Sequence, residues 1–344
     1  MASRRQPVMS PPRVSVIIIN YNGGAFLQQA VNSLSRQTFR DFELIVFDNA
    51  STDGSAEMLD LSGIPAGRLV RSAENIGFAS GNNRAADLAT GKWLALLNPD
   101  TVAEPDWLEK LLAAADAHPE CRNFASAQLD LNSADTLDGA GDAYLVFGIP
   151  WRGGFGRRAS ELPGMGWCFS ACGAAAMYDL ALFREIGGFD ERFFCYCEDV
   201  DLGFRLQLAG HDCLFVNTAV VHHAGSGITG RASAFSTYHG TRNRIWTYFK
   251  NMPPGILLVT LPGHIALTLY IIVRNAFTPR FKPMLRGVVD GVAGLPAICR
   301  PSVWKLPRRA LKTRRLLSRM AWNPWRMSTR KAHVRDLTSK PADQ

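Results

Sequence analysis

The sequence lacks the motifs that would assign it directly to several common enzyme classes. No G-x-G-x-x-G follows the first apolar run, at residues 14–19, so a dinucleotide-binding fold is not indicated. No G-x-x-x-x-G-K-[ST] is present, which argues against a P-loop nucleotide hydrolase. The absence of G-x-S-x-G removes the signature of the α/β-hydrolase nucleophile.

The sequence also has little apolar content at residues 1–12, which are basic and proline-rich, so we expect no secretory leader. We expect these residues to be disordered, and we expect a reducing, cytoplasmic location in which the seven cysteines are free thiols. Two pairs, Cys168/Cys172 and Cys195/Cys197, are close in sequence. Their C-x3-C and C-x-C spacings are poor for zinc and favour ordinary packed cysteines.

Acidic residues are scarce from Arg300 onward, where only Asp336 and Asp343 occur. The basic residues of this tail are Arg300, Lys305, Arg308, Arg309, Lys312, Arg314, Arg315, Arg319, Arg326, Arg330, Lys331, Arg335 and Lys340. The net charge of the whole chain is +8, so the remainder is close to neutral. Such a tail indicates an anionic partner, either phospholipid headgroups or nucleic acid. Base-stacking aromatics are not interleaved on a defined domain, so we expect no nucleic-acid partner.

What the sequence does contain is an alternation of strand and helix patterns in its first hundred residues. Apolar, β-branched runs typical of buried strands lie at residues 14–19, 43–47, 68–71 and 93–98, and helical spacing at residues 25–37 and 78–91. The polar stretch 48–55 contains residues that cap helices, so we expect a further helix after it. This order predicts βαβ units, and therefore an α/β fold with a mostly parallel central sheet.

Polar clusters follow the carboxyl ends of these predicted strands, where open α/β sheets bind their ligands. The clusters are Asn20-Tyr21-Asn22, Asp48-Asn49 and Asn98-Pro99-Asp100. A structural turn would explain any one of them, but their convergence favours a shared binding site. A buried carboxylate such as that of Asp100 also needs a metal, another cation or a hydrogen-bond donor.

The middle of the chain, residues 105–235, breaks the alternation after a predicted helix at 106–117. Glu198, Asp199 and Asp201 begin another predicted helix. Capping of the helix dipole would explain acids there, although this cluster carries more charge than a cap requires. A later strand ends in His222 and His223, for which both a packed position and a metal or phosphate role remain open.

A long apolar run at residues 254–273 has only His264 as an ionisable side chain, and it is interrupted by Pro262 and Gly263. Its length just reaches a bilayer span, but a re-entrant or in-plane segment fits the interruption as well. A buried helix of a soluble domain with a basic surface tail is the remaining alternative. The tryptophans that follow suit the headgroup zone on the cytoplasmic side, and these are Trp304, Trp322 and Trp325.

The motifs as a set resemble the inverting family 2 glycosyltransferases with the GT-A fold, and in particular their rhamnosyltransferase-like branch. The matching segments, in family order, are VSVIIINYNG, VFDNASTDGS, ENIGFASGNN, LLNPDT, GGFDERFFCYCEDVDLGFRL and VVHH. The resemblance implies a GT-A domain at residues 13–250, with a nucleotide-sugar-binding half at 13–104 and an acceptor and catalytic half at 105–250. A membrane-associating region at residues 251–344 would follow.

The resemblance also implies roles for individual residues. Asp48 would hydrogen-bond the nucleotide base. The other residues assigned to the nucleotide sugar are Asn20, Tyr21, Asn75, Gly81, Asn82 and Asp100. Asp100 would hold a Mg²⁺ or Mn²⁺ that bridges the diphosphate, with His222 as a further ligand or phosphate contact. Asp199 would be the general base, supported by Glu198. Arg242 and Arg244 would neutralise the diphosphate or contact the acceptor.

Two departures from the family pattern limit these expectations. Asn98 occupies the first acidic position of the D-x-D element, so one carboxylate would hold the metal together with waters and phosphates. The Q-x-x-R-W motif of processive members is absent, so we expect transfer of one sugar or a few.

The function implied is transfer of a sugar, with L-rhamnose from dTDP-rhamnose suggested by the branch, to a lipid-linked or cell-surface glycan. The enzyme would act at the cytoplasmic face of the cell membrane, in the synthesis of a bacterial surface polysaccharide. A catalytically inactive, membrane-bound sugar-nucleotide scaffold is one alternative. A GT-A-like nucleotidyltransferase is another, although such enzymes have a basic residue in the loop after the first strand, where this chain has NYNGG.

Overall fold

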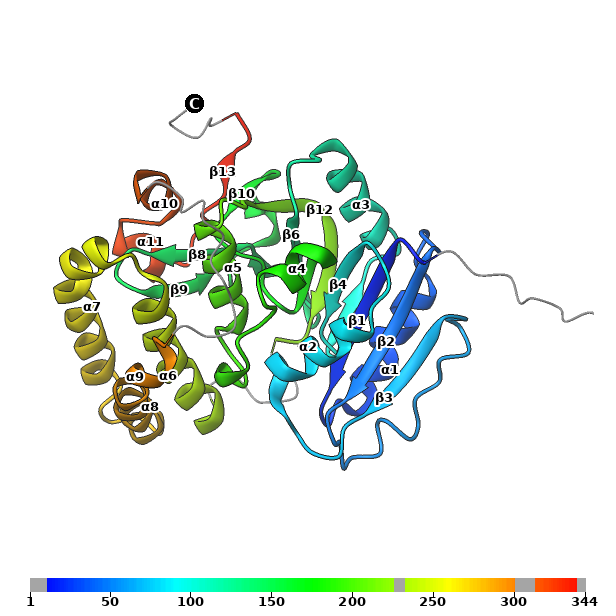
Figure 1. Ribbon diagram of the computed structural model, residues 1–344, viewed down its shortest axis with the longest axis horizontal. Coiled ribbons are helices and arrows are strands. Elements are labelled where there is room, and N and C mark those ends of the chain that lie inside the picture. The colour runs from blue at the N-terminus through cyan, green and yellow to red at the C-terminus, as the bar shows by residue number, and fades with distance from the viewer. Residues whose placement is uncertain (1–10, 226–232, 301–312, 339–344) are drawn as a thin grey trace, which may run out of the picture.

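The computed structural model describes residues 11–225, 233–300 and 313–338 (Figure 1). Of residues 1–12, for which disorder is expected, residues 1–10 lie outside the described residues, and residues 11 and 12 are described. Trp304 and part of the basic tail, namely Lys305, Arg308, Arg309, Lys312 and Lys340, also lie outside the described residues.

The N-terminal half is the predicted parallel α/β unit. Strands β1 (Val14–Asn20), β2 (Phe42–Asp48), β3 (Gly67–Arg71) and β4 (Trp93–Leu97) pair in parallel in the order β4-β1-β2-β3. Helices α1 (Gly24–Ser35) and α2 (Gly77–Leu88) cover opposite faces. Val16 and Ile18 of β1 belong to the same core cluster as Leu27 of α1, whereas Ile17 packs with Ala79 of α2. Burial on both faces explains the continuous apolar run of β1.

The second half widens this sheet with further strands, of which the sequence predicted only the one that ends in His222 and His223. They are β5 (Thr101–Ala103), β6 (Asn123–Asp130), β7 (Ser133–Ala140), β10 (Gly166–Cys168), β11 (Ala175–Asp179), β12 (Cys213–His223) and β13 (Arg335–Asp336). Apart from the parallel pair of β6 and β12, their pairings are antiparallel. The main sheet, which has 11 strands within the described residues, is therefore mixed. The mostly parallel arrangement predicted for the sheet holds for its first half, whereas in the second half only β6 and β12 pair in parallel.

The helix expected after residues 48–55 is absent from the structure, since the described chain between β2 and β3 forms turns and bends. The side chains that would cap such a helix have other partners. The Asn20 side-chain nitrogen donates to Asp48 Oδ1 at 2.8 Å, to Ser51 Oγ at 3.0 Å and to Ser55 Oγ at 2.9 Å. These bonds fasten the turn to the end of β1.

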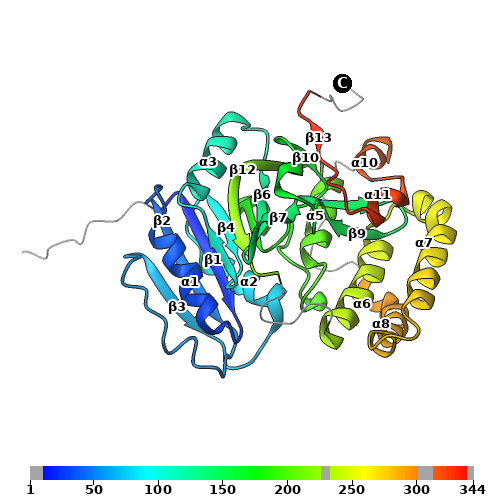
Figure 2. The same ribbon diagram turned by 180° about the vertical axis from the view of Figure 1, so that it is seen from behind.

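The second half also contains further helices, and those of residues 234–298 form a layer at the end of the molecule opposite β1–β3 (Figures 1 and 2). The helices of this half are α3 (Trp107–Ala117), α4 (Leu180–Glu185), α5 (Glu198–Leu208), α6 (Ala234–Asn251), α7 (Pro254–Arg274), α8 (Phe281–Ala293), α9 (Leu295–Ile298), α10 (Thr313–Arg319) and α11 (Pro324–Ser328). Short 3-10 turns lie at Ala159–Glu161 and Glu191–Phe193. The positions of α3 and of the start of α5 confirm two predicted helices.

A hairpin of β8 (Asp142–Leu145) and β9 (Ile149–Arg152) stands apart from the main sheet. Its apolar side chains share a cluster with Leu267 and Ile271 of α7 and with Met327 of α11. The basic C-terminal region also folds onto the domain, since Arg319 is buried and pairs with Asp212. The hairpin therefore connects the C-terminal helices with the interior of the molecule.

Buried charges join α5 to α6. Asp201 accepts hydrogen bonds from Arg205 at 2.9 Å, Lys250 at 2.8 Å and Asn251 at 2.7 Å. Burial alone would raise the pKa of Asp201, but the charges of Lys250 and Arg205 outweigh burial and lower it. Asp201 is thus a structural member of the acidic cluster that the sequence presented as one group.

Candidate active site

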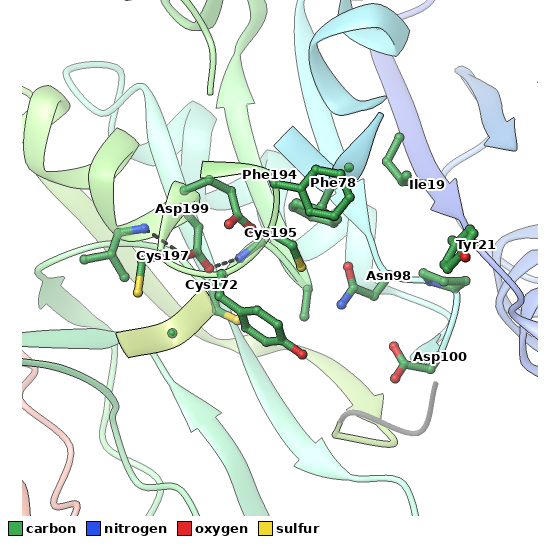
Figure 3. A pocket seen from close by; sticks show the side chains of 18 of the residues that line it. Ile19, Tyr21, Phe78, Asn98, Asp100, Cys172, Phe194, Cys195, Cys197 and Asp199 are labelled. Atoms are coloured by element: carbon green, nitrogen blue, oxygen red, sulfur yellow. Dashed lines mark hydrogen bonds between the residues drawn. The ribbon is translucent and has the colours of Figure 1, made fainter. Parts of the chain in front are cut away.

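A cavity of about 720 Å³ lies beyond the carboxyl ends of β1 and β4 (Figure 3). Segments distant in sequence line it. They are the ends of β1 and β4, residues 194–200 before and within α5, the β8–β9 hairpin and the end of β12. Asp100 and Tyr21 lie on one side of this cavity, and Asp199 lies on the opposite side.

The residues predicted to bind the nucleotide divide into two groups. Tyr21, Asn75 and Asp100 line the cavity, and Asn75 Oδ1 accepts a hydrogen bond of 2.9 Å from Asn49, which also lines it. The remaining predicted residues, Asn20, Asp48, Gly81 and Asn82, are not part of the lining. Buried Asn20 and Asp48 bond each other beneath the cavity, so they support the loop that carries Tyr21.

The other two predicted nucleotide residues serve the packing of α2. A Cβ on Gly81 would come within 3.1 Å of Ile19 Cγ2, so this residue allows α2 to lie close to the sheet. Asn82 is buried and its side-chain nitrogen donates to the carbonyl oxygen of Phe78 at 2.9 Å. Neither contact places a polar group in the cavity.

Of the two adjacent histidines, the structure brings His223 to the cavity rather than His222. Successive residues of a strand point to opposite faces. His222 Nε2 lies 2.7 Å from Glu104 Oε1 and is not part of the lining, whereas His223 Nε2 lies 3.3 Å from Asp100 Oδ1. His223, and not the predicted His222, is therefore the histidine placed to contact a cation beside Asp100.

The donor set around Asp100 fits a divalent cation in its chemistry. Asp138 Oδ2 lies 2.7 Å from His223 Nδ1, the arrangement by which an outer carboxylate orients a metal-ligating imidazole. The side-chain oxygen of Asn98, beside Asp100, is buried and has no hydrogen-bond partner in the described part of the chain. Burial opposes the protonation of His223, but its hydrogen bonds to Asp100 and Asp138 raise its pKa. This corner thus attracts positive charge.

The number of ligands is small, however. Among the described residues, no group of three or more His, Cys, Asp or Glu side chains is arranged to hold a metal ion. Asp100 and His223 would hold it, and the remaining ligands would come from phosphate oxygens and water, as Mg²⁺ sites commonly allow.

Asp199 is held rigidly on the opposite side, in the first turn of α5. Its Oδ2 accepts from the Gly173 N–H at 2.9 Å and its Oδ1 from the Val200 N–H at 2.8 Å (Figure 3). Burial raises the pKa of Asp199, while these two bonds and the charge of Arg152 oppose the rise. The result is an oriented carboxylate that is more basic than an exposed one.

The loop before Asp199 has a strained backbone. Phe194, Tyr196 and Cys197 have φ angles of 65°, 70° and 64°, which non-glycine residues rarely adopt. Such strain persists where surrounding structure holds it, and it concentrates at functional sites. The loop brings aromatic rings and Cys195 into the cavity beside Asp199.

Two further carboxylates lie near Asp199. Glu198, as predicted, lines the cavity; it is buried, and burial followed by the charge of Asp199 raises its pKa well above the usual value. Asp142, at the start of β8, lines the same cavity, and its pKa is raised by the same two causes. No motif contains Asp142, so its place in the cavity could not be predicted from the sequence.

The two predicted arginines lie outside the lining. Arg242 packs over the Trp246 ring at 4.2 Å and donates to the carbonyl oxygen of Phe193 at 3.0 Å. Arg244 is buried and donates to Thr268 Oγ1 of α7 at 3.0 Å. Among the described residues that line the cavity, the only arginine or lysine is Arg152 of β9.

The mixed sheet, the cavity at its strand ends and the two carboxylates facing across it define a glycosyltransferase of the GT-A class. The chain belongs to glycosyl transferase family 2, whose family model matches residues 15–187. The resemblance predicted from the motifs is thereby confirmed.

Curated relatives agree with this assignment. An N-acetylglucosaminyl-diphospho-decaprenol L-rhamnosyltransferase of Mycobacterium tuberculosis is 29% identical over 308 residues, which are 80% of this chain and 97% of the relative. The O-antigen biosynthesis protein RfbC of Myxococcus xanthus is 31% identical over 231 residues, 64% of this chain but 18% of that protein. The rhamnosyltransferase-like character expected from the motifs is confirmed.

Solved structures share the fold. The mannosyltransferase PcManGT of Pyrobaculum calidifontis, in complex with GDP-Man and Mn²⁺, superposes with a TM-score of 0.52 at 16% identity, covering 83% of this chain and 88% of that one. S. aureus TarS gives a TM-score of 0.56 at 15% identity over 90% of this chain and 50% of its own. At such identities the likeness concerns the fold alone, and it confirms the predicted GT-A architecture.

Proposed function

We propose that the protein is an inverting glycosyltransferase that moves L-rhamnose from dTDP-rhamnose to a polyprenyl-diphosphate-linked glycan. The observation that carries the proposal is the single cavity with Asp100, which His223 contacts, at one side and Asp199 at the other. The name of the mycobacterial relative, which this chain matches over 97% of its length, supports the sugar and the lipid-linked acceptor. Residues 13–104 would bind the donor and residues 105–250 the acceptor.

The mechanism follows from where the carboxylates lie. Asp100 and His223 would hold a Mn²⁺ or Mg²⁺, and such an ion would supply neutralising charge for the diphosphate leaving group. Asp199 takes the proton from the acceptor hydroxyl as that oxygen bonds the anomeric carbon. The bond to the diphosphate breaks on the opposite face, its electron pair leaves with the phosphate oxygen, and the configuration inverts. The backbone bonds to Asp199 keep its carboxylate aimed during this step.

On acidification, the rate of transfer is expected to start falling while the pH is still above 3.8, which is the ordinary pKa of an aspartate. Asp199 can act as a base only when ionised, and burial raises its pKa. Activity should therefore be complete above the raised pKa and lost as the pH falls through it. The pH profile of kcat/KM, with circular dichroism to monitor folding, measures this. A profile that stays flat down to pH 3.8 would exclude a raised pKa for the base.

We further propose that the protein docks on the cytoplasmic leaflet of an anionic phospholipid membrane. Helix α7 buries polar side chains, the reverse of the usual pattern for a helix of a soluble domain. Its buried residues include Thr260, His264 and Thr268. Their partners are Tyr248, the Phe147 carbonyl oxygen and Arg244, all within the folded domain. The opposite face exposes apolar side chains, among them Leu258 at 75%, Val259 at 78% and Val273 at 71%. Lipid is the partner that suits such a face.

The contacts of α7 favour an in-plane orientation. By length and composition, α7 is the one helix among the described residues that could cross a membrane. Its polar face, however, stays bonded to the domain along most of its length, and a spanning helix would break these bonds. Neighbouring α8 and the segment around α11 present further apolar and basic side chains, which are Leu285, Val289, Val292, Trp322, Trp325, Arg280, Lys282 and Arg286. Such a surface suits acidic headgroups.

The docking surface can be tested by flotation with vesicles of phosphatidylcholine and phosphatidylglycerol. The wild type is expected to float, and replacement of Leu258, Val259 and Val273 by glutamine to weaken binding roughly tenfold or more, since each buried aliphatic side chain contributes about 1.5–3 kcal/mol. Glutamine at Met58 and Leu88, exposed apolar residues in the donor-binding half, is the matched control. Equal flotation of the two variants, or no flotation of the wild type, would refute the assignment.

The catalytic proposal is tested by a thermal-shift screen of nucleotide sugars with and without Mn²⁺, followed by transfer of labelled sugar to a polyprenyl-diphosphate N-acetylglucosamine. We expect dTDP-rhamnose to stabilise the protein, more so with Mn²⁺, and to donate its sugar. A scaffold would bind without transfer, and a nucleotidyltransferase would release pyrophosphate from a nucleoside triphosphate. Absence of stabilisation by every nucleotide sugar would overturn the proposal.

A further inference from the structure

The cavity is lined by a positively charged side chain, to which neither the motifs nor the comparisons assign a role. Arg152, at the end of β9, is the only arginine or lysine among the described residues that line it. It lies opposite Asp142 in the hairpin register, and its side chain is 30% exposed. A guanidinium in a site lined by so many carboxylates is expected either to balance their charge or to bind an anion.

Arg152 is held at a fixed place beside the candidate metal ligands. Its Nη1 donates to Asp138 Oδ2 and lies 3.5 Å from His223 Nδ1. The same Asp138 oxygen lies 2.7 Å from His223 Nδ1, so one buried carboxylate anchors both side chains. His223 Nε2 in turn faces Asp100. The guanidinium and the corner that attracts positive charge therefore form one continuous surface.

The rest of the guanidinium is available to a ligand. Nε and Nη2 of Arg152 have no hydrogen-bond partner in the parts of the chain that the structure describes. The side chain also needs a glycine beside it, because a Cβ on Gly139 would come within 2.9 Å of its Cγ and Cδ. The surrounding chain thus leaves space for the aliphatic part of the Arg152 side chain and binds its Nη1. Its Nε and Nη2 remain available to a ligand.

We propose that Arg152 binds the diphosphate of the nucleotide donor and stabilises the charge that develops on it as the sugar leaves. A guanidinium can bind two phosphate oxygens at once, and such charge-assisted bonds are stronger than neutral ones. The need is greater here because Asn98 replaces an acidic residue beside Asp100, which leaves fewer ligands for a cation. Arg152 transfers no proton: the proton goes to Asp199, and the electron pair of the broken C–O bond goes to the phosphate oxygen.

This inference rests on the proposed function. Measuring the binding of dTDP alone tests the role of Arg152 separately from the transfer reaction. Calorimetry should show that Arg152→Met weakens dTDP roughly 10- to 100-fold, the effect of losing charge-assisted hydrogen bonds, and dTMP much less. Turnover should fall as well, and Arg152→Lys should recover part of both. Arg157→Met is the matched control, since Arg157 lies in the same segment outside the cavity and pairs with Glu161. It should bind dTDP as the wild type does.

Other outcomes have distinct meanings. If the wild type binds no dTDP but does bind UDP or GDP, the proposed donor is wrong and Arg152 is tested with that nucleotide. If Arg152→Met binds the diphosphate as the wild type does, the inference is overturned; a shift of the acidic limb of its pH–rate profile would then show that Arg152 acts through Asp199. Gly139→Ala, which displaces the stem without removing the charge, should also weaken dTDP binding, and it replaces Arg152→Met if that variant does not fold.

Discussion

Asp199→Asn is expected to lower the rate of sugar transfer about 10²–10⁴-fold, the usual effect of removing a positioned general base. Asparagine keeps the shape of the side chain and can still accept a hydrogen bond from the Gly173 or Val200 N–H. It cannot take the proton of the acceptor hydroxyl. The affinity for dTDP-rhamnose should therefore stay within a few-fold of the wild type, because Asp100 and His223 lie on the opposite side of the cavity.

Single-turnover transfer and calorimetric donor binding measure the two effects separately. Asp87→Asn makes the same chemical change on the exposed face of α2 and should alter neither. If Asp199→Asn lost donor affinity instead of turnover, Asp199 would belong to the donor site. If it kept full turnover, another carboxylate would be the base, and Glu198 and Asp142 both line the same cavity near Asp199.

His223→Ala is expected to lower Mn²⁺-dependent transfer roughly 100- to 1,000-fold, because a bound metal supplies several kcal/mol of charge stabilisation and each 1.36 kcal/mol is tenfold in rate. His222→Ala is the matched control. It removes the neighbouring imidazole, which contacts Glu104 outside the cavity, and should change the rate by less than about twofold. Titration of the rate with Mn²⁺ after chelation measures both variants. The opposite order of effects would restore His222 as the ligand and contradict the structure.

The parallel half of the fold could be predicted from the sequence because its strands are covered on both faces. In β1 and β2 every residue is buried, so these strands are mainly apolar, and they are followed by amphipathic helices or turns. Strand β7 offers no such signal, since SADTLDGA is exposed at one end and buried at the other. Its place in the sheet depends on pairing with β6, a tertiary contact that no local pattern encodes.

In the candidate site, too, some residues could be predicted from local motifs, whereas others depend on tertiary contacts. Asp100 and Asp199 could be predicted because each lies in a motif, and the structure places both in one cavity. The choice between His222 and His223 depends on which face of β12 meets the cavity, and this is set by the register with β5 and β6. Arg152 lies in a hairpin without a motif, and it reaches the cavity only through long-range packing of that hairpin.

The membrane segment illustrates a different limit. The sequence reveals the length and hydropathy of residues 254–273, which leave spanning, re-entrant and in-plane arrangements open. Only the packing of α7 on α6 and the hairpin identifies which of its faces is occupied. The face of α7 that packs on the domain is the polar one. The average hydropathy of the segment cannot reveal this, because it does not distinguish one face of the helix from the other.

The most direct measurement is a crystal structure of the Asp199→Asn protein with dTDP-rhamnose and Mn²⁺. We expect the diphosphate to lie between Asp100, His223 and Arg152, with the anomeric carbon facing the side chain at position 199 across the cavity. A nucleotide sugar bound elsewhere, or one whose anomeric carbon points away from position 199, would contradict the claim that one cavity joins the donor site to the catalytic base.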